Sequence, residues 1–307
     1  MPLPVEEAIN ALIDSDKPLL SSRLVELSNL NAQELALFEK AWQTIEPKRR
    51  RQIIYRLVEL AEDNFELDFE GIFKRRLKDE DADVQSKAIE GLWESEETGL
   101  IDPLIELLEP ENAEKVQATA ATALGKFAML AELEKLRPKH KTRVCRALLG
   151  VIEDTSRSLE IKRRALEAAA PLSLPQMEKA IARAYQSGVP RLKTSAIFAM
   201  GKNCDLRWLP ILIRELTNAD AEIRYEAAQA CGELGEKEAA PYLSELTTDP
   251  DIDVQLAAIQ ALGRLGGPEA KDSLERCLTD DSEVIQQAAE EALAELEAGE
   301  DPLSFRM

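Results

Sequence analysis

Ile223-Arg-Tyr-Glu-Ala-Ala-Gln-Ala-Cys-Gly232 returns 31 residues later as Val254-Gln-Leu-Ala-Ala-Ile-Gln-Ala-Leu-Gly263. In both copies an apolar residue, here called the key residue, is followed by Ala four and seven positions later and by Gly nine positions later. A repeat of this length is typical of stacked copies of one small unit, each of which contacts only its neighbours.

The key position can be followed through eight copies of the repeat. The key residues are Ile53, Val84, Val116, Ile161, Leu192, Ile223, Val254 and Ile285. Consecutive key residues stand 31 or 32 positions apart, except that 45 positions separate Val116 from Ile161. The extra length predicts an insertion or a lengthened helix near residues 130–138.

Each copy is expected to form two antiparallel helices. Across residues 206–235, apolar residues recur at three- and four-residue spacing in two runs, one on each side of Asn218-Ala219-Asp220. Asp220 is placed to cap the second helix and Gly235 to end it. The first helix is expected to bury Leu206, Leu209, Leu212, Ile213 and Leu216. The pattern predicts an all-α fold, an α-solenoid of stacked helix pairs.

Three parts of the chain are expected. Residues 1–46 look helical but match the repeat poorly, which is typical of a divergent N-terminal cap because a terminal copy faces water. Residues 47–298 are expected to form the solenoid, with the insertion near 130–138. Residues 299–307 are expected to form a C-terminal tail.

The stretch from Asp251 to Gly266 resembles the HEAT repeat, in the short variety named after phycobilisome lyases. The resemblance covers about residues 47–297 and implies a curved solenoid whose second helices line the concave face. In that family an Asp before the second helix and an Arg just after the key residue link neighbouring copies. Here Arg224 keeps the Arg, whereas glutamine replaces it in four other copies, so the resemblance favours an amide ladder made by Gln85, Gln117, Gln255 and Gln286.

The net charge of −20 is unevenly distributed. Residues 205–307 carry 24 acidic and 8 basic side chains, whereas residues 1–204 carry 34 acidic and 30 basic side chains. Within the first part, residues 135–164 are rich in Lys and Arg and form a basic waist, which can bind an acidic partner or only be solvated. Contact between this waist and the acidic end of another copy offers a route to self-association. Nucleic-acid binding is disfavoured, because a chain of this charge repels a duplex unless its basic residues are gathered.

No apolar run approaches the ~20 residues that are needed to cross a bilayer, so no membrane partner is expected. The first residues also lack the order of a secretory signal, and a cytoplasmic location is therefore expected. The four cysteines contain no C-x-x-C pair, which favours buried, reduced thiols at Cys145, Cys204, Cys231 and Cys277.

The sequence offers no catalytic constellation. Its single histidine, His140, lies in a basic turn and is expected to be solvated. Deoxyhypusine hydroxylase, a relative of the repeat family, binds two irons through several His-Glu pairs that this chain lacks. We therefore expect a chain without enzymatic activity, metal or cofactor. Two alternatives stay open: a bilin lyase-type or chromophore-handling enzyme, and a nucleic-acid-binding protein.

The predicted binding surface is the exposed stripe of the second helices. Positions two, three, six and ten after each key residue should point away from the first helices, given ~100° per residue. Phe198, Tyr225 and Leu256 are expected to form an apolar line that anchors a protein partner, and Arg163 and Arg164 to engage its acidic groups. The residues predicted to bind the partner are Tyr55, Arg56, Lys87, Lys126, Arg163, Arg164, Phe198, Lys202, Tyr225, Gln229, Leu256 and Gln260.

Trp93 departs from the repeat. It stands nine positions after its key residue, where four other copies hold Gly125, Gly201, Gly232 and Gly263, and it is expected to plug a local gap. The sequence thus leads to the hypothesis of a non-catalytic scaffold or adaptor that binds a protein on its concave face.

Overall fold

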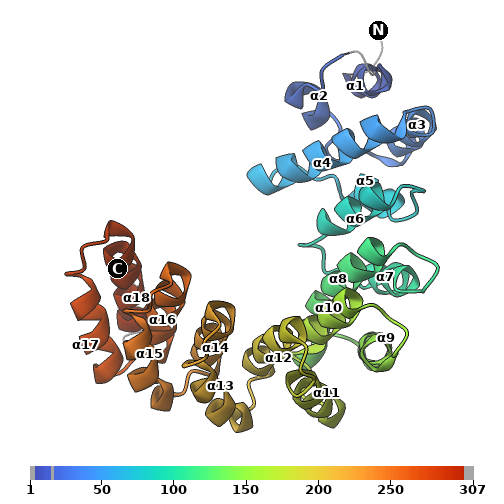
Figure 1. Cartoon of the computed structure of the whole chain (residues 1–307). Helices are drawn as coiled ribbons and strands as arrows, with labels where there is room; N and C mark the ends of the chain where they lie inside the picture. The colour runs from blue at the N-terminus through green and yellow to red at the C-terminus, as the bar shows by residue number, and fades with distance from the viewer. Residues whose placement is uncertain (1–3, 15–16, 301–307) are drawn as a thin grey trace. The chain divides into compact units, whose positions relative to one another are not determined.

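The computed structural model describes residues 4–14 and 17–300. Within these ranges the chain forms 18 α-helices and three short 3-10 helices, and none of these residues lies in a strand (Figure 1). The predicted all-α solenoid is confirmed. The chain divides into two compact units between residues 168 and 169.

The first unit contains helices α1 to α10, in which α4, α6 and α8 lie side by side. Helix α5 packs on α6, and α7 packs on α8. The extra length between Val116 and Ile161 lies in α8 and α9, which are 19 and 16 residues long. The elements are α1 (Pro4–Ile13), α2 (Ser21–Val25), α3 (Ala32–Trp42), α4 (Pro47–Asp63), α5 (Glu70–Arg76), α6 (Ala82–Glu90), η1 (Thr98–Leu100), α7 (Ile101–Leu107), α8 (Glu114–Glu132), α9 (Pro138–Glu153) and α10 (Leu159–Ala169).

The second unit repeats one pattern four times. Helices α11, α13, α15 and α17 are the first, or A, helices, and each packs on the second, or B, helix that follows it. The B helices α12, α14, α16 and α18 pack in that order, each against the next. The elements are α11 (Pro175–Tyr185), α12 (Pro190–Asn203), η2 (Leu206–Trp208), α13 (Leu209–Glu215), α14 (Ala221–Leu234), η3 (Lys237–Ala239), α15 (Ala240–Leu246), α16 (Ile252–Leu265), α17 (Pro268–Cys277) and α18 (Glu283–Glu300).

The repeating residues form the core of both units. All key residues are buried except Leu192, which is half-buried in the first turn of α12. The alanines four positions after the key residue are completely buried: Ala88, Ala120, Ala165, Ala196, Ala227 and Ala258. In the copy at 206–235, however, Leu206 is 54% exposed and Trp208 is buried. The prediction for Leu206 was wrong because a 3-10 turn opens this copy and turns Trp208 inward.

The predicted helix ends of the copy at 206–235 are confirmed. The Asp220 side chain accepts a hydrogen bond from the backbone N–H of Glu222, which satisfies one free amide at the start of α14. Gly235 ends α14 with φ of 70°, a left-handed conformation that glycine adopts without steric cost.

Glycine nine positions after the key residue lets consecutive B helices touch. A Cβ added at Gly201 would lie 2.7 Å from the Cα of Ala230, seven positions after the next key residue. In the first unit, a Cβ at Gly125 would lie 3.2 Å from the Cα of Ala168. The glycine and the alanine therefore form one contact between two copies, with backbone against backbone.

The polar links between copies differ from the predicted amide ladder. Arg224 donates two hydrogen bonds to Asp249 of the next copy, at 2.7 and 2.8 Å. The glutamines instead donate to backbone carbonyls: Gln85 to Leu77, Gln117 to Asn112, Gln255 to Asp249 and Gln286 to Asp280. The predicted amide ladder was wrong for Gln85, Gln255 and Gln286, because each carbonyl lies in the turn before the glutamine's own helix, within reach of its side chain. Gln117 does link two copies, since its side-chain oxygen also accepts a hydrogen bond from Arg157 of the next copy.

Several smaller predictions need correction. All four cysteines are free, but Cys204 is exposed and Cys145 is half-buried, whereas Cys231 is fully buried and burial raises its pKa to about 12. His140 is half-buried, and its Nδ1 atom is buried without a hydrogen-bond partner among the described residues. Helix α18 continues to Glu300, two residues into the tail expected at 299–307, and residues 301–307 lie outside the described part of the chain.

Candidate functional site

The twelve residues predicted to bind a partner all lie on B helices, six in each unit. In the first unit they belong to α4, α6, α8 and α10, and in the second to α12, α14 and α16. In each unit every one of them is exposed or half-buried. Within each unit, therefore, the predicted residues belong to one layer of helices, which Figure 1 shows as ribbons.

In the first unit the structure brings Tyr55 of α4 together with Lys87 of α6. The Lys87 ammonium lies 5.2 Å from the centre of the Tyr55 ring and 2.9 Å from a Glu90 carboxylate oxygen. Arg56 pairs with Glu59 on its own helix at 2.8 Å. An aromatic ring and paired charges thus share this part of the B-helix layer.

Arg163 and Arg164 are already occupied by carboxylates of their own helix. Both guanidinium groups pair with Glu160, at 2.8 and 2.9 Å, and both pair with Glu167. Burial works to raise the pKa of Glu160, but the two arginines outweigh burial and hold that pKa below its usual value. An acidic partner would have to compete with these intrahelical pairs.

In the second unit the predicted residues lie on three consecutive B helices. Tyr225 of α14 is 36% exposed, while Phe198 of α12 and Leu256 of α16 are half-buried. The side-chain amides of Gln229 and Gln260 hydrogen-bond to each other at 3.2 Å. Phe198 stands six positions after its key residue, as these two glutamines do, whereas Tyr225 and Leu256 stand two positions after theirs. The apolar line is therefore staggered by one helical turn.

Two serines of the predicted stripe do not face solvent. Ser86 and Ser195 are buried, although the helical spacing placed them on the exposed face. Ser195 donates a hydrogen bond to the Arg191 carbonyl of its own helix. A serine is small enough to fit between packed helices, which the spacing alone does not reveal.

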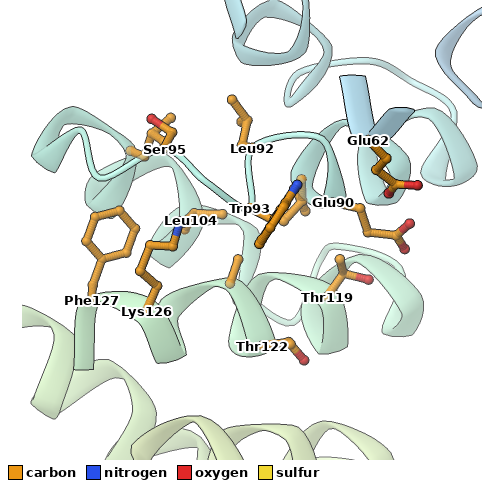
Figure 2. Close-up of a pocket in the computed structure, with 13 residues that line it drawn as sticks. Glu62, Glu90, Leu92, Trp93, Ser95, Leu104, Thr119, Thr122, Lys126 and Phe127 are labelled. Atoms are coloured by element: carbon orange, nitrogen blue, oxygen red, sulfur yellow. The ribbon is translucent and has the colours of Figure 1, made fainter. Parts of the chain in front are cut away.

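An open cleft between α6, α7 and α8 was not predicted from the sequence. The cleft has a volume of about 460 Å³, and its walls are mostly apolar (Figure 2). Trp93 stands at its centre in Figure 2, between Glu62 and Glu90 on one side and Leu104, Lys126 and Phe127 on the other. Trp93 is 57% exposed, so the prediction that it plugs a gap was wrong.

The sequence around Trp93 explains why the cleft forms. Helix α6 has nine residues and ends at Glu90, whereas α12, α14 and α16 have 14 residues each. At Gly91 a Cβ would lie 2.6 Å from the Phe73 ring, so this ring occupies the place of the usual alanine side chain. Trp93 takes the position of the contact glycine, and it is far too large for contact between helix backbones. The replacement of the contact glycine by Trp93 was the sequence signal for this cleft, and its interpretation as a plugged gap was wrong.

A second hollow continues from the cleft across the B helices of the first unit. It has a volume of about 660 Å³ and shares Glu90, Thr119 and Thr122 with the cleft. Beyond these shared residues it is lined mainly by charged side chains, which are Glu114, Lys115, Glu160 and Arg164. The cleft and this hollow, which carries more charged residues, together form one continuous surface of the first unit.

The described residues show neither a metal cluster nor a membrane span. Within 4–14 and 17–300, no group of three or more His, Cys, Asp or Glu side chains is arranged to hold a metal ion. No helix in these same ranges is long and apolar enough to cross a bilayer. The chemistry that these surfaces offer is apolar contact, hydrogen bonding and ion pairing.

Comparison with solved structures finds similar chains at low sequence identity. The chain is similar to the complex of CpcE and CpcF of phycocyanin lyase from Nostoc sp. PCC7120, with 19% identity, coverage of 74% of this chain and 87% of that chain, and a TM-score of 0.51. Human deoxyhypusine hydroxylase is similar at 17% identity, with coverage of 95% and 96% and a TM-score of 0.36. The Kap95:Nup1 complex is similar at 14% identity, with coverage of 95% of this chain and 41% of that chain and a TM-score of 0.42.

Sequence comparison identifies the repeat directly. No curated protein matches the chain. The family model described as HEAT repeats matches residues 70–148 and 209–294, which together make up more than half of the chain. These segments include α5 to α8 of the first unit and α13 to α17 of the second. The chain belongs to the HEAT-repeat family.

Proposed function

We propose that this chain is a non-catalytic scaffold that binds a partner protein through the exposed face of its B helices. HEAT repeats support a role in protein interaction, because they build extended layers of helices without requiring a reaction centre. The observation that carries the proposal is the set of apolar side chains on three consecutive B helices of the second unit, with polar groups around them.

The second unit supplies a candidate anchor region. Tyr225 combines an exposed ring with a hydroxyl group, and aromatic side chains of this kind dominate the binding energy of many interfaces. Phe198 and Leu256 add apolar area on the neighbouring helices. Lys202 lies 5.9 Å from the centre of the Phe198 ring and pairs with Glu233 at 2.8 Å, so charged groups border the apolar side chains. An apolar centre with a polar rim is the usual arrangement of a protein interface.

The first unit supplies polar groups on its own B-helix layer. Tyr55, Arg56 and Lys87 lie on α4 and α6, while Lys126 lies on α8. Arg163 and Arg164 follow on α10 and can exchange their intrahelical carboxylates for those of a partner. We assign this unit the role of fixing the orientation of the partner, because exposed charge pairs contribute more to specificity than to affinity.

The test is affinity purification with the full chain, followed by titration calorimetry with the captured partner. The test variant carries Phe198→Ala, Tyr225→Ala and Leu256→Ala. A matched control carries Leu206→Ala and Tyr242→Ala, two exposed apolar side chains outside the proposed surface. We expect Kd to rise at least tenfold for the test variant and less than twofold for the control. Equal binding by all three proteins would refute the surface.

A further inference from the structure

The Trp93 cleft has the size and lining of a pocket for one bulky apolar side chain. Its volume of about 460 Å³ lies within the ~300–1,000 Å³ range of pockets that hold ligands. Ile89, Leu92, Leu104 and Phe127 contribute apolar walls from three helical segments. A leucine, phenylalanine or tryptophan side chain from outside would fill space that the chain's own residues leave open.

Trp93 gives the cleft an exposed aromatic ring that a bound group can contact. More than half of the Trp93 side chain is exposed, whereas Trp42 and Trp208 are 1% and 9% exposed. A large, exposed indole within an apolar cleft gains contact area when a second apolar group is placed beside it. Tryptophan is also among the residues most enriched at the energetic centres of interfaces.

The charges around the cleft favour certain residues next to that apolar side chain in a bound segment. Glu62 and Glu90 line the cleft; Glu90 pairs with Lys87 at 2.9 Å, whereas Glu62 makes no ion pair among the described residues. Lys126 lines the other side, where Glu94 and Glu96 act on it electrostatically. Burial lowers the pKa of Lys126 in spite of these two carboxylates, as expected for an ammonium group above an apolar floor. With Glu90 paired to Lys87, the carboxylates of Glu62, Glu94 and Glu96 outnumber the single ammonium group of Lys126 at the cleft.

The adjoining hollow also carries more acidic than basic charge. There Lys115 pairs with Asp83 at 2.6 Å, and Arg164 pairs with Glu160 and Glu167. Glu114 accepts a hydrogen bond from Ser158, a neutral group that leaves its negative charge in place. The positive charges of this hollow are thus already matched, while acidic charge is left over.

We propose that the Trp93 cleft docks a peptide segment of the partner in which one bulky apolar residue is flanked by lysine or arginine. The apolar side chain enters the cleft beside Trp93, and the basic flanks face Glu62 and the acidic groups of the adjoining hollow. Charge complementarity selects this occupant over an acidic or uncharged segment. The inference rests on the proposed function, because it names part of the partner that the B-helix layer would hold.

The test selects twelve-residue peptides from a random displayed library on the full chain. We expect enriched peptides to share a bulky apolar residue with Lys or Arg within two positions of it. A synthetic copy of the most enriched peptide, free of tryptophan, should bind at least tenfold more weakly to Trp93→Ala and to Glu62→Lys than to the unaltered chain. Glu66→Lys makes the same charge change on a side chain that does not line the cleft, and it should change Kd less than twofold.

Fluorescence locates the bound peptide independently of the variants. Since Trp42 and Trp208 are buried, Trp93 is the tryptophan that an aqueous quencher reaches most readily. Peptide binding should shift its emission to shorter wavelength and at least halve its quenching by acrylamide. Failure to enrich peptides, enrichment of acidic flanks, or binding without a Trp93 signal would overturn the inference.

The two proposals fail separately. In one outcome, the captured partner loses affinity for the variant altered at Phe198, Tyr225 and Leu256 but binds Trp93→Ala and Glu62→Lys normally. That outcome would contradict peptide docking in the Trp93 cleft and would still support the scaffold function. If the peptides require the cleft but no partner requires the second-unit residues, the surface proposed for the scaffold falls instead.

Discussion

The B helices of the two units are joined in different ways at the same repeat position. Between α12 and α14, Gly201 lies against Ala230 and the helix backbones touch. Between α6 and α8, Trp93 stands where the glycine would be, α6 ends early, and a cleft opens. At this position, therefore, glycine closes the contact between two B helices, whereas tryptophan leaves room for another molecule.

The contact between Gly201 and Ala230 should give the largest effect, because it leaves no space for an added side chain. We expect Gly201→Leu to lower the free energy of unfolding by about 2–3 kcal/mol, since any side chain here must push the Ala230 backbone away. Gly150→Leu on α9 is the matched control, because a Cβ at Gly150 meets no atom within 4 Å. The control should gain about 0.5–1 kcal/mol from better helix propensity. Urea unfolding followed by circular dichroism measures both, and equal losses would contradict the role of the contact.

The ion pair between copies should have the next largest effect. Asp249 is buried and accepts two hydrogen bonds from Arg224, so Asp249→Asn should lower the free energy of unfolding at neutral pH by about 1.5–2 kcal/mol. Asp253→Asn, at an exposed position on α16, should change it by less than about 0.5 kcal/mol.

The same pair predicts a dependence of stability on pH. Burial works to raise the pKa of Asp249, but the hydrogen bonds from Arg224 and from the Asp251 amide outweigh burial, so the pKa lies below its usual value. A depressed folded-state pKa gives stability that is complete above the unfolded-state value of about 3.9 and is lost as pH falls through the folded-state value. Between pH 5 and pH 2, Asp249→Asn should therefore lose less stability than the unaltered chain. Parallel curves for the two proteins would rule this out.

The glutamine that replaces the arginine in the first unit should matter less. Gln85 donates only to the Leu77 carbonyl of its own copy, at 3.0 Å. We expect Gln85→Ala to lower the free energy of unfolding by about 1 kcal/mol, the value of one neutral hydrogen bond. If urea unfolding gave Gln85→Ala and Asp249→Asn the same loss of unfolding free energy, the ion pair between copies would be no stronger than the hydrogen bond within one copy, contrary to our expectation.

The smallest effect on stability is expected at the open contact. Because Trp93 is more than half exposed, Trp93→Ala should change the free energy of unfolding by less than about 1 kcal/mol. Trp42→Ala removes a fully buried indole and should cost about 3–5 kcal/mol. Thermal unfolding of the two variants distinguishes an exposed tryptophan that is available for binding from a buried one that stabilises the core. A large loss from Trp93→Ala would assign it to the core.

The sequence predicted those features that depend on neighbours along one helix or on the repeat itself. The period located the key residues and the buried alanines, and the caps at Asp220 and Gly235 followed from local backbone chemistry. It did not predict the inward turn of Trp208 or the burial of Ser195, because both depend on which helix lies opposite. The same reason explains why Gln85, Gln255 and Gln286 donate to a turn carbonyl of their own copy and do not reach the next copy.

Spacing and residue type alone were enough to establish a stack of helix pairs, since every copy must hide the same apolar stripe against its neighbours. The cleft was decided only in three dimensions, where the Phe73 ring fills the space beside Gly91, α6 ends at Glu90, and Trp93 turns into solvent. A repeat pattern records what each copy must bury. It does not record what happens when a large side chain cannot fit between two backbones and the helices must give way.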